Sequence, residues 1–153
     1  MFKVVHVIWS ATIGGIERVV MDLISQQQKN NDLEVSLLIG KSEGDYLPAF
    51  NALTSKVYSL GLKSGNDISP TQYLKAKNIF LQHDIIHIHS FNPLIAWAAR
   101  NSGKRIIYTE HGNFGVGKKK SWRDDLVTSL QKRFLNASVD TIIFNSRFSQ
   151  QKH

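Results

Sequence analysis

Short apolar runs rich in β-branched residues alternate with longer helical patterns along the whole of this 153-residue chain. Near-continuous apolar runs of this length are typical of strands covered on both faces in a parallel sheet. Since parallel neighbours need right-handed crossovers, the alternation predicts a doubly wound α/β fold. We expect a mostly parallel sheet of about six or seven strands with helices on both faces. The predicted strands are residues 3–9, 34–39, 56–60, 84–89, 105–109 and 141–145.

The first helix has the clearest pattern. Apolar residues recur at i, i+3, i+4, i+7 and i+8 from Ile16 to Ile24, which predicts one stripe packed on the sheet. Weaker helical patterns cover residues 71–82, 93–101 and 121–137. A chain of this length buries roughly 70% of its unfolded surface, so residues 1–153 are expected to form a single domain.

Composition narrows the class of protein. Apolar residues make up 42% and charged residues 20%, as in soluble globular domains. The formal net charge of +7 favours an anionic partner: nucleic acid, a phosphorylated small molecule or an acidic membrane surface. The sequence has no cysteine, no pattern of a secretory leader and no apolar run near the roughly 20 residues of a membrane span, so we expect a cytoplasmic protein.

Gly14 and Gly15 stand where the first strand gives way to the first helix. A helix N-terminus presents unpaired N–H groups that attract phosphate, and glycines let a ligand approach the backbone closely. The alternative is that both glycines only serve the turn. The dinucleotide fingerprint is excluded because no third glycine is in register. Residues 40–42 (GKS) lack the earlier glycine of a P-loop and are interpreted as a strand-ending turn.

Three histidines are further candidates. His87 and His89 are two apart on a strand and face the same way, but without cysteine or a nearby carboxylate a metal site is disfavoured. His111 follows a strand, at the edge where open α/β sheets bind ligands. A purely structural, hydrogen-bonded role for His111 stays open at this point.

Four motifs occur in order: GGIERVVMDL, DIIHIHSFNP, YTEHGNF and DTIIFNSRFS. Together they resemble the N-terminal half of the retaining GT-B glycosyltransferases of family four, and the resemblance spans essentially the whole chain. It implies a Rossmann-like domain, the acceptor-side one of two that face each other across a cleft.

The resemblance also implies roles for single residues. Gly14 and Gly15 match the family's glycine loop near the donor diphosphate, and His111 matches the histidine that reaches the transferred sugar. Glu17 matches the acid after the loop, where we expect it to complement the helix dipole rather than to catalyse. The remaining matches line the cleft and are treated as substrate-binding: His89, Ser90, Ser146 and Arg147.

The family implies a nucleoside-diphosphate-sugar donor, a glycan, lipid or other acceptor, and no cofactor or metal. Its donor-binding domain, with a Glu-x7-Glu motif, is missing from this sequence, so we expect this piece alone to be inactive. Lys118, Lys119 and Lys120 are candidates for contact with an anionic membrane or acceptor, against the alternative of a solvated loop.

Three other functions stay open at the level of sequence. A sugar-nucleotide epimerase would share the fold. A nucleic-acid-binding module would need basic residues clustered on one face with interleaved aromatics, but apart from Lys118–Lys120 and Arg123 they are scattered, so no nucleic-acid partner is expected. A non-catalytic, flavodoxin-like domain is the third.

Overall fold

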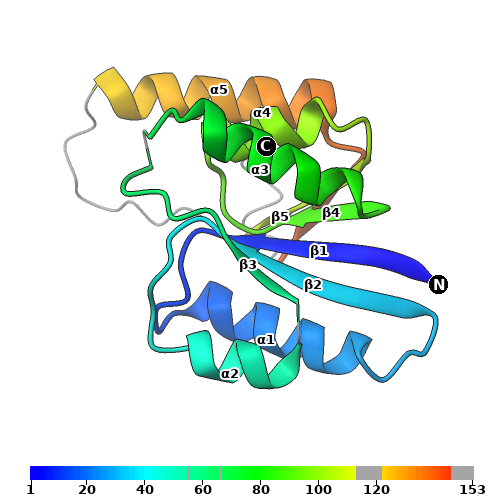
Figure 1. Ribbon diagram of the computed structural model, residues 1–153. Helices are drawn as coiled ribbons and strands as arrows, with labels where there is room; N and C mark the ends of the chain where they lie inside the picture. Colours follow the sequence, from blue (N-terminus) through cyan, green and yellow to red (C-terminus); the bar gives the residue numbers. More distant parts are fainter. Residues whose placement is uncertain (55, 66, 113–121, 146–153) are drawn as a thin grey trace.

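The computed structural model describes residues 1–54, 56–65, 67–112 and 122–145. Six parallel strands form one sheet in the order β3-β2-β1-β4-β5-β6 (Figure 1). The strands are β1 (Phe2–Ile8), β2 (Leu33–Ile39), β3 (Val57–Ser59), β4 (Ile85–Ile88), β5 (Arg105–Glu110) and β6 (Thr141–Phe144). The helices are α1 (Gly15–Gln27), α2 (Leu47–Leu53), α3 (Pro70–Leu81), α4 (Pro93–Arg100) and α5 (Trp122–Ser138).

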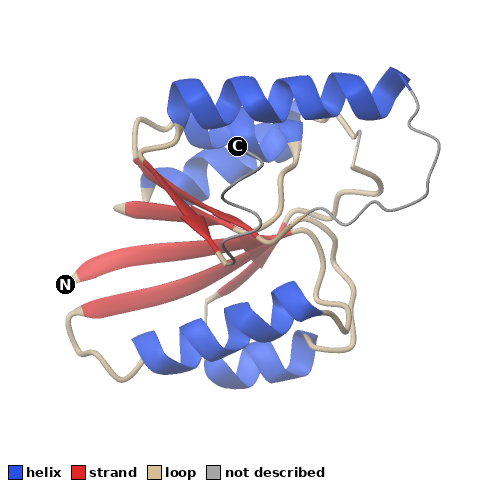
Figure 2. Ribbon diagram, turned by 180° about the vertical axis from the view of Figure 1, so that it is seen from behind, coloured by secondary structure: helices blue, strands red, loops and turns tan. Residues whose placement is uncertain are grey.

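The helices cover the sheet in two layers. Helices α1 and α2 lie on one face, and α3, α4 and α5 lie on the other (Figures 1 and 2). The chain changes faces between β3 and β4, so the strand order reverses between the neighbours β1 and β4. In doubly wound sheets this switch point opens a crevice at the carboxyl ends of the strands, where ligands bind.

Side chains alternate between the two faces of the sheet along each strand, so the molecule has two cores. Val5 and Val7 of β1 and Ile86 and Ile88 of β4 pack in the larger core, which includes the buried side chains of α3 and α4. The smaller core lies under α1 and α2, where Ile8 meets apolar residues of β2. On that side, His6 lies between Val4 and Ile8 of β1 and is fully buried.

The predicted fold class is confirmed, with six strands in the described sheet. Helix α2 was not predicted, because its seven residues are too few to show a period and only Phe50 among them is buried. The stripe of α1 is narrower than expected: Val20 and Ile24 are fully buried, whereas Val19 is 42% exposed. Instead, Glu17 lies on the buried side of α1.

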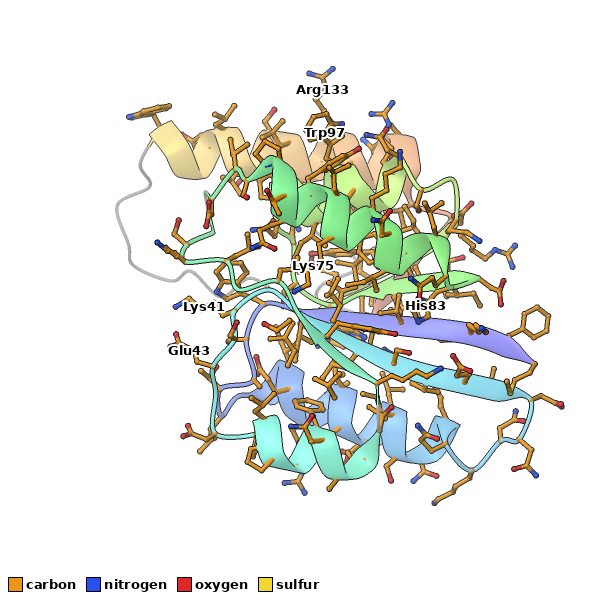
Figure 3. All side chains as sticks on the ribbon, viewed as in Figure 1. Lys41, Glu43, Lys75, His83, Trp97 and Arg133 are labelled. Atoms are coloured by element: carbon orange, nitrogen blue, oxygen red, sulfur yellow. The ribbon has the colours of Figure 1, made fainter. Side chains whose placement is uncertain are left out.

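The GKS segment is a strand-ending turn, as its sequence indicates. Gly40 N–H donates to the Ile8 carbonyl and Lys41 N–H to the Trp9 carbonyl, which ties this turn to the end of β1. The ammonium of Lys41 pairs with Glu43 at 3.0 Å on the surface (Figure 3). Both the backbone and the side chain of Lys41 therefore make contacts that stabilise this turn.

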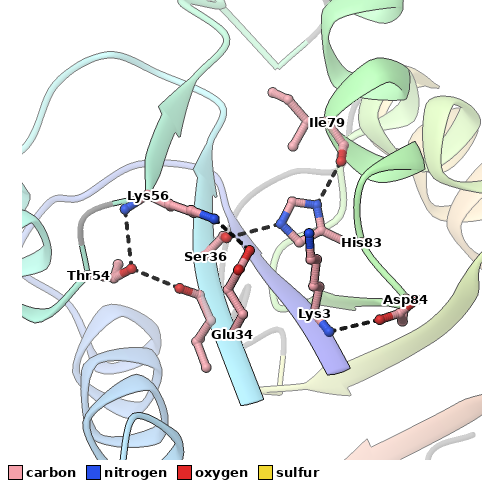
Figure 4. Close-up of polar contacts among 9 residues, drawn as sticks. Lys3, Glu34, Ser36, Thr54, Lys56, Ile79, His83 and Asp84 are labelled. Carbon is pink, nitrogen blue, oxygen red and sulfur yellow. Dashed lines mark hydrogen bonds and ion pairs between the residues drawn. The ribbon is translucent and has the colours of Figure 1, made fainter. Parts of the chain in front are cut away.

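The amino ends of the strands are joined by a separate set of polar contacts (Figure 4). His83, just after α3, contacts the Ile79 carbonyl through Nδ1 at 2.7 Å and the Ser36 hydroxyl through Nε2 at 3.0 Å. Lys56 pairs with Glu34 at 2.6 Å. His83 therefore joins α3 to β2 at the edge opposite the expected ligand site.

Across the part of the chain that the structure describes, none of the helices combines the length and the apolar character needed to cross a membrane.

Candidate functional site

The glycine loop lies at the carboxyl edge, between β1 and the N-terminus of α1. Gly14 is the N-cap residue with extended backbone (φ −166°), and neither Gly14 nor Gly15 has a positive φ, so backbone freedom does not account for them. A Cβ on Gly14 would collide with the carboxylate of Glu17, whereas a Cβ on Gly15 would have no atom of the described residues within 4 Å. Gly15 therefore borders open space, as close approach of a ligand to the helix N-terminus requires.

Three buried histidines share the face of the sheet that α1 covers. His6 of β1 pairs in register with His87 of β4, and His89 follows two residues later on the same side. The rings of His87 and His89 are 4.1 Å apart between centroids, and those of His6 and His89 are 5.2 Å apart. The switch point thus places imidazoles where the adjoining residues of β1 and β4, such as Val5, Val7, Ile86 and Ile88, are aliphatic.

A continuous hydrogen-bonded chain runs from α1 to His111. His6 Nε2 lies 2.8 Å from Gln27 Oε1, and His6 Nδ1 lies 3.0 Å from His89 Nε2. His89 Nδ1 in turn lies 3.2 Å from His111 Nε2. We call Gln27, His6, His89 and His111 the histidine relay.

His87 stands beside the relay and bonds elsewhere. Its Nε2 lies 2.8 Å from the hydroxyl of Thr109, which is also buried. His6, His87 and His89 place one ring nitrogen each within 4.8 Å of one another, a spacing that could hold a metal ion. However, both nitrogens of His6 and of His89 and the Nε2 of His87 are already within hydrogen-bond distance of a partner. The geometry therefore favours a bonded network of imidazoles.

Burial keeps the site neutral. Desolvation lowers the pKa of His6 to about 4, although its bond to Gln27 opposes the shift. Desolvation, with repulsion from His6 and His111, lowers the pKa of His87 to about 3. The pKa of His89 is well below 6.5 for the same reasons, and burial lowers the pKa of His111 while Glu110 opposes this. At neutral pH these imidazoles are uncharged, so each can donate one hydrogen bond and accept another.

The turn after β5 holds His111 at the end of the relay. Gly112 has φ +79°, a left-handed conformation that favours glycine. Its N–H donates to Glu110 Oε1 at 3.0 Å, which closes the turn around His111. The His111 side chain is half-buried, so it lies between the buried relay and the carboxyl edge.

The structure locates five of the predicted site residues at the carboxyl edge: Gly14, Gly15, His89, Ser90 and His111. Of these it joins His89 directly to His111. Ser146, Arg147 and the three lysines Lys118, Lys119 and Lys120 lie outside the described residues.

Sequence reasoning missed His6, Gln27 and Thr109. Gln27 had a readable signal, because it continues the buried positions of Val20 and Ile24 along α1. Thr109 shares a face with His111 by strand alternation. No sequence pattern predicted that His6 contacts His89, because the sequences of β1 and β4 do not show that these two strands are neighbours.

Comparisons with known proteins agree with this architecture. HepE from Anabaena, solved with UDP and with UDP-glucose, superposes with TM-scores of 0.73 and 0.74 at 15% and 14% identity. These matches cover 97% and 99% of this chain and 39% of HepE. The UDP-GlcNAc 2-epimerase from Neisseria meningitidis, bound to UDP-GlcNAc, gives a TM-score of 0.56 at 15% identity over 96% of this chain and 47% of the epimerase.

This chain thus spans less than half the length of the solved proteins it matches. No curated protein sequence matches it. The family model described as Glycosyltransferase Family 4 matches residues 13–153, which include the glycine loop, His87, His89 and His111. The chain has the Rossmann-like fold of the GT-B structures and belongs to Glycosyltransferase Family 4.

Proposed function

We propose that residues 1–153 form the acceptor-side domain of a retaining glycosyltransferase that uses a nucleoside-diphosphate sugar. The observation that carries the proposal is the edge shared by the Gly14-Gly15 loop and His111, on either side of the switch point between β1 and β4. The match to Glycosyltransferase Family 4 supports it, as does the fold shared with HepE solved with UDP-glucose. A separate donor-binding domain completes the enzyme.

In this proposal the N-terminus of α1 faces the donor diphosphate. The open space at Gly15 lets phosphate oxygens approach the free N–H groups of the first turn. The leaving diphosphate then assists removal of the acceptor's proton on the same face of the sugar, which gives retention. Ser90, Ser146 and Arg147 contact substrate, and no cofactor takes part.

His111 contacts the transferred sugar. Because it is uncharged at neutral pH and half-buried, it can form a hydrogen bond to a sugar hydroxyl whose strength changes as charge develops in the transition state. In the enzyme that contains this domain, His111→Ala should lower kcat by about 100-fold and change donor KM little, on the scale of a lost transition-state hydrogen bond.

The matched control is His83→Asn at the opposite edge. It should lower the unfolding temperature and leave kcat intact, because His83 bonds only within the fold. Wild-type kcat in His111→Ala would remove His111 from the site, and a pure KM effect would limit it to ground-state binding.

A sugar-nucleotide epimerase is the second candidate, favoured by the fold shared with UDP-GlcNAc 2-epimerase. The two reactions differ in their need for an acceptor. An epimerase converts UDP-GlcNAc alone, whereas a transferase releases UDP in step with glycosylation of an acceptor. Epimerised donor in the absence of acceptor would overturn the transferase proposal.

We further propose a cytoplasmic enzyme whose acceptor side touches an anionic membrane surface. The supporting observation is on α5, where Trp122 is 70% and Leu126 is 52% exposed, directly after the lysines at 118–120. Basic residues near such a surface contribute on the order of 1 kcal/mol each. Replacing all three lysines by glutamine should reduce sedimentation with anionic vesicles. Equal sedimentation with neutral vesicles at low salt would contradict this proposal.

A further inference from the structure

We propose that Gln27, His6 and His89 are positioning residues that fix the orientation and the tautomer of His111 through the histidine relay. This inference rests on the proposed function for its purpose, because the relay ends on the residue that we assign to the sugar. The relay itself stands on the three distances, from 2.8 to 3.2 Å, that join four side chains of α1, β1, the end of β4 and the turn after β5.

The direction of the relay follows from the chemistry of its far end. Gln27 presents its carbonyl oxygen to His6 Nε2, so this nitrogen carries the proton and donates. A neutral His6 then accepts at Nδ1 from His89 Nε2–H, and His89 accepts at Nδ1 from His111 Nε2–H. His111 Nδ1 takes no part in these bonds and keeps its lone pair when the ring is neutral.

This polarity matters for His111 because its Nε2 donates whether the ring is neutral or protonated. The ring can therefore accept a hydrogen bond or a proton at Nδ1 without breaking its bond to His89. If the relay ran the other way, His111 Nε2 would have to accept from His89, and protonation of His111 would break that bond. An amide on α1 thus decides which nitrogen of His111 is an acceptor.

Burial explains why the ring nitrogens of the relay need partners. His6 and His89 are almost fully buried, so an unpaired ring nitrogen there has no water to replace its partner. Among the described residues, the other titratable groups beside the relay are His87, whose ring is tilted against that of His89, and Glu110, next to His111 in the chain. Burial lowers the pKa of His6, His89 and His111, which keeps the relay neutral.

The test compares variants of Gln27 by nitrogen NMR of the 153-residue chain labelled in its imidazoles. In the wild type we expect scalar couplings across the His6–His89 and His89–His111 N–H···N bonds, with His111 protonated at Nε2. Gln27→Leu removes the acceptor at the far end. We then expect His6 to reverse its tautomer, His111 to shift towards the Nδ1–H form that is minor in water, and its pKa to fall.

Gln27→Glu supplies a permanent acceptor, so it should keep both couplings and raise the pKa of His111. The matched controls are Gln28→Leu and Gln28→Glu, since Gln28 is the exposed neighbour. Both should leave the His111 signals unchanged. Opposite shifts in the two Gln27 variants, absent from the Gln28 variants, support the relay.

Absence of both couplings in the folded wild-type chain would overturn the proposal, even if Gln27→Leu did not fold. Identical His111 spectra in wild type, Gln27→Leu and Gln27→Glu would also overturn it. The result is independent of activity: if His111→Ala kept full transferase activity while the couplings were present, the catalytic assignment would fail and the relay would stand.

Discussion

The two faces of strand β4, extended by His89 directly after it, both carry buried side chains but are held by different forces. Ile86 and Ile88 face α3 and α4 and pack in the larger core, whereas His87 and His89 face the other way and bond to polar partners. Aliphatic burial is favourable in many orientations, because it requires only removal from water. A buried imidazole is tolerated only when its nitrogens have partners, so it fixes directions in space. The apolar face holds the sheet together, and the histidine face positions groups at its carboxyl edge.

The largest loss of stability is expected when a side chain of the apolar face is truncated. Ile86→Ala should lower the free energy of unfolding by about 3 to 4 kcal/mol, because Ile86 is fully buried in the larger core and a cavity would remain. His87→Ala on the opposite face should cost about half as much. Urea denaturation at pH 7.5 measures both, and an equal cost would contradict the distinction between the faces.

Acid should weaken the histidine face specifically. Above pH 6.5, His6 is neutral in both states. Below pH 6.5, His6 binds a proton in the unfolded chain but stays neutral in the native state, where its pKa is about 4. The free energy of unfolding should therefore fall by about 1.4 kcal/mol per pH unit from His6, or about 3 kcal/mol by pH 4.

His87, with a pKa of about 3, should add to this loss. The variant His6→Gln lacks the first group, so denaturation series from pH 7 to 4 should give it a shallower slope than the wild type. Equal slopes of the free energy of unfolding against pH would show that native His6 binds a proton as readily as the unfolded chain does.

A smaller effect is expected from a single bond of the histidine face. Thr109→Val keeps the shape of the side chain but removes the hydroxyl that lies 2.8 Å from His87 Nε2. The buried nitrogen loses its partner, which should cost about 1 to 2 kcal/mol. Thr141→Val on the exposed end of β6 is the matched control and should change stability by less than about 0.5 kcal/mol. Equal effects of the two variants would argue against a stabilising bond.

The smallest change in the free energy of unfolding is expected for a substitution at the carboxyl edge of the sheet, at Gly15. Gly15→Ala should leave the free energy of unfolding unchanged or raise it by up to about 1 kcal/mol, since the added methyl meets no atom of the residues that the structure describes and the position is helical. Gly40→Ala places a methyl 2.7 Å from the Trp9 ring and should destabilise the fold. Destabilisation by Gly15→Ala would mean that the space beside it is not open.

Much of the fold was predictable from the pattern of apolar residues. The strands contain continuous apolar runs that few other structures accommodate, so all six described strands were predicted to within two residues at each end. Helix α2 was missed because a seven-residue helix with one buried residue carries no period. In α5, Leu126 and Leu130 are exposed whereas Phe134, four residues further along, is buried, because the packing partners of α5 decide which face is covered.

The site was predictable in part. Gly14, Gly15, His89 and His111 follow strands that end at one edge, and chain order alone indicates this. His6 and Gln27 could not be joined to them from the sequence, because His6 and His89 are 83 residues apart and meet only through the pairing of β1 with β4.

The sequence by itself determined the alternation of strands and helices, the parallel sheet and the family, because period and motif order are local properties. Only the tertiary structure decided the strand order, the register of His6 opposite His87 and the relay to His111. The physical reason is that neighbouring parallel strands are joined by long crossovers. Which residues then face each other depends on how two cores pack at once, and a shift of one residue in register would turn every histidine to the other face.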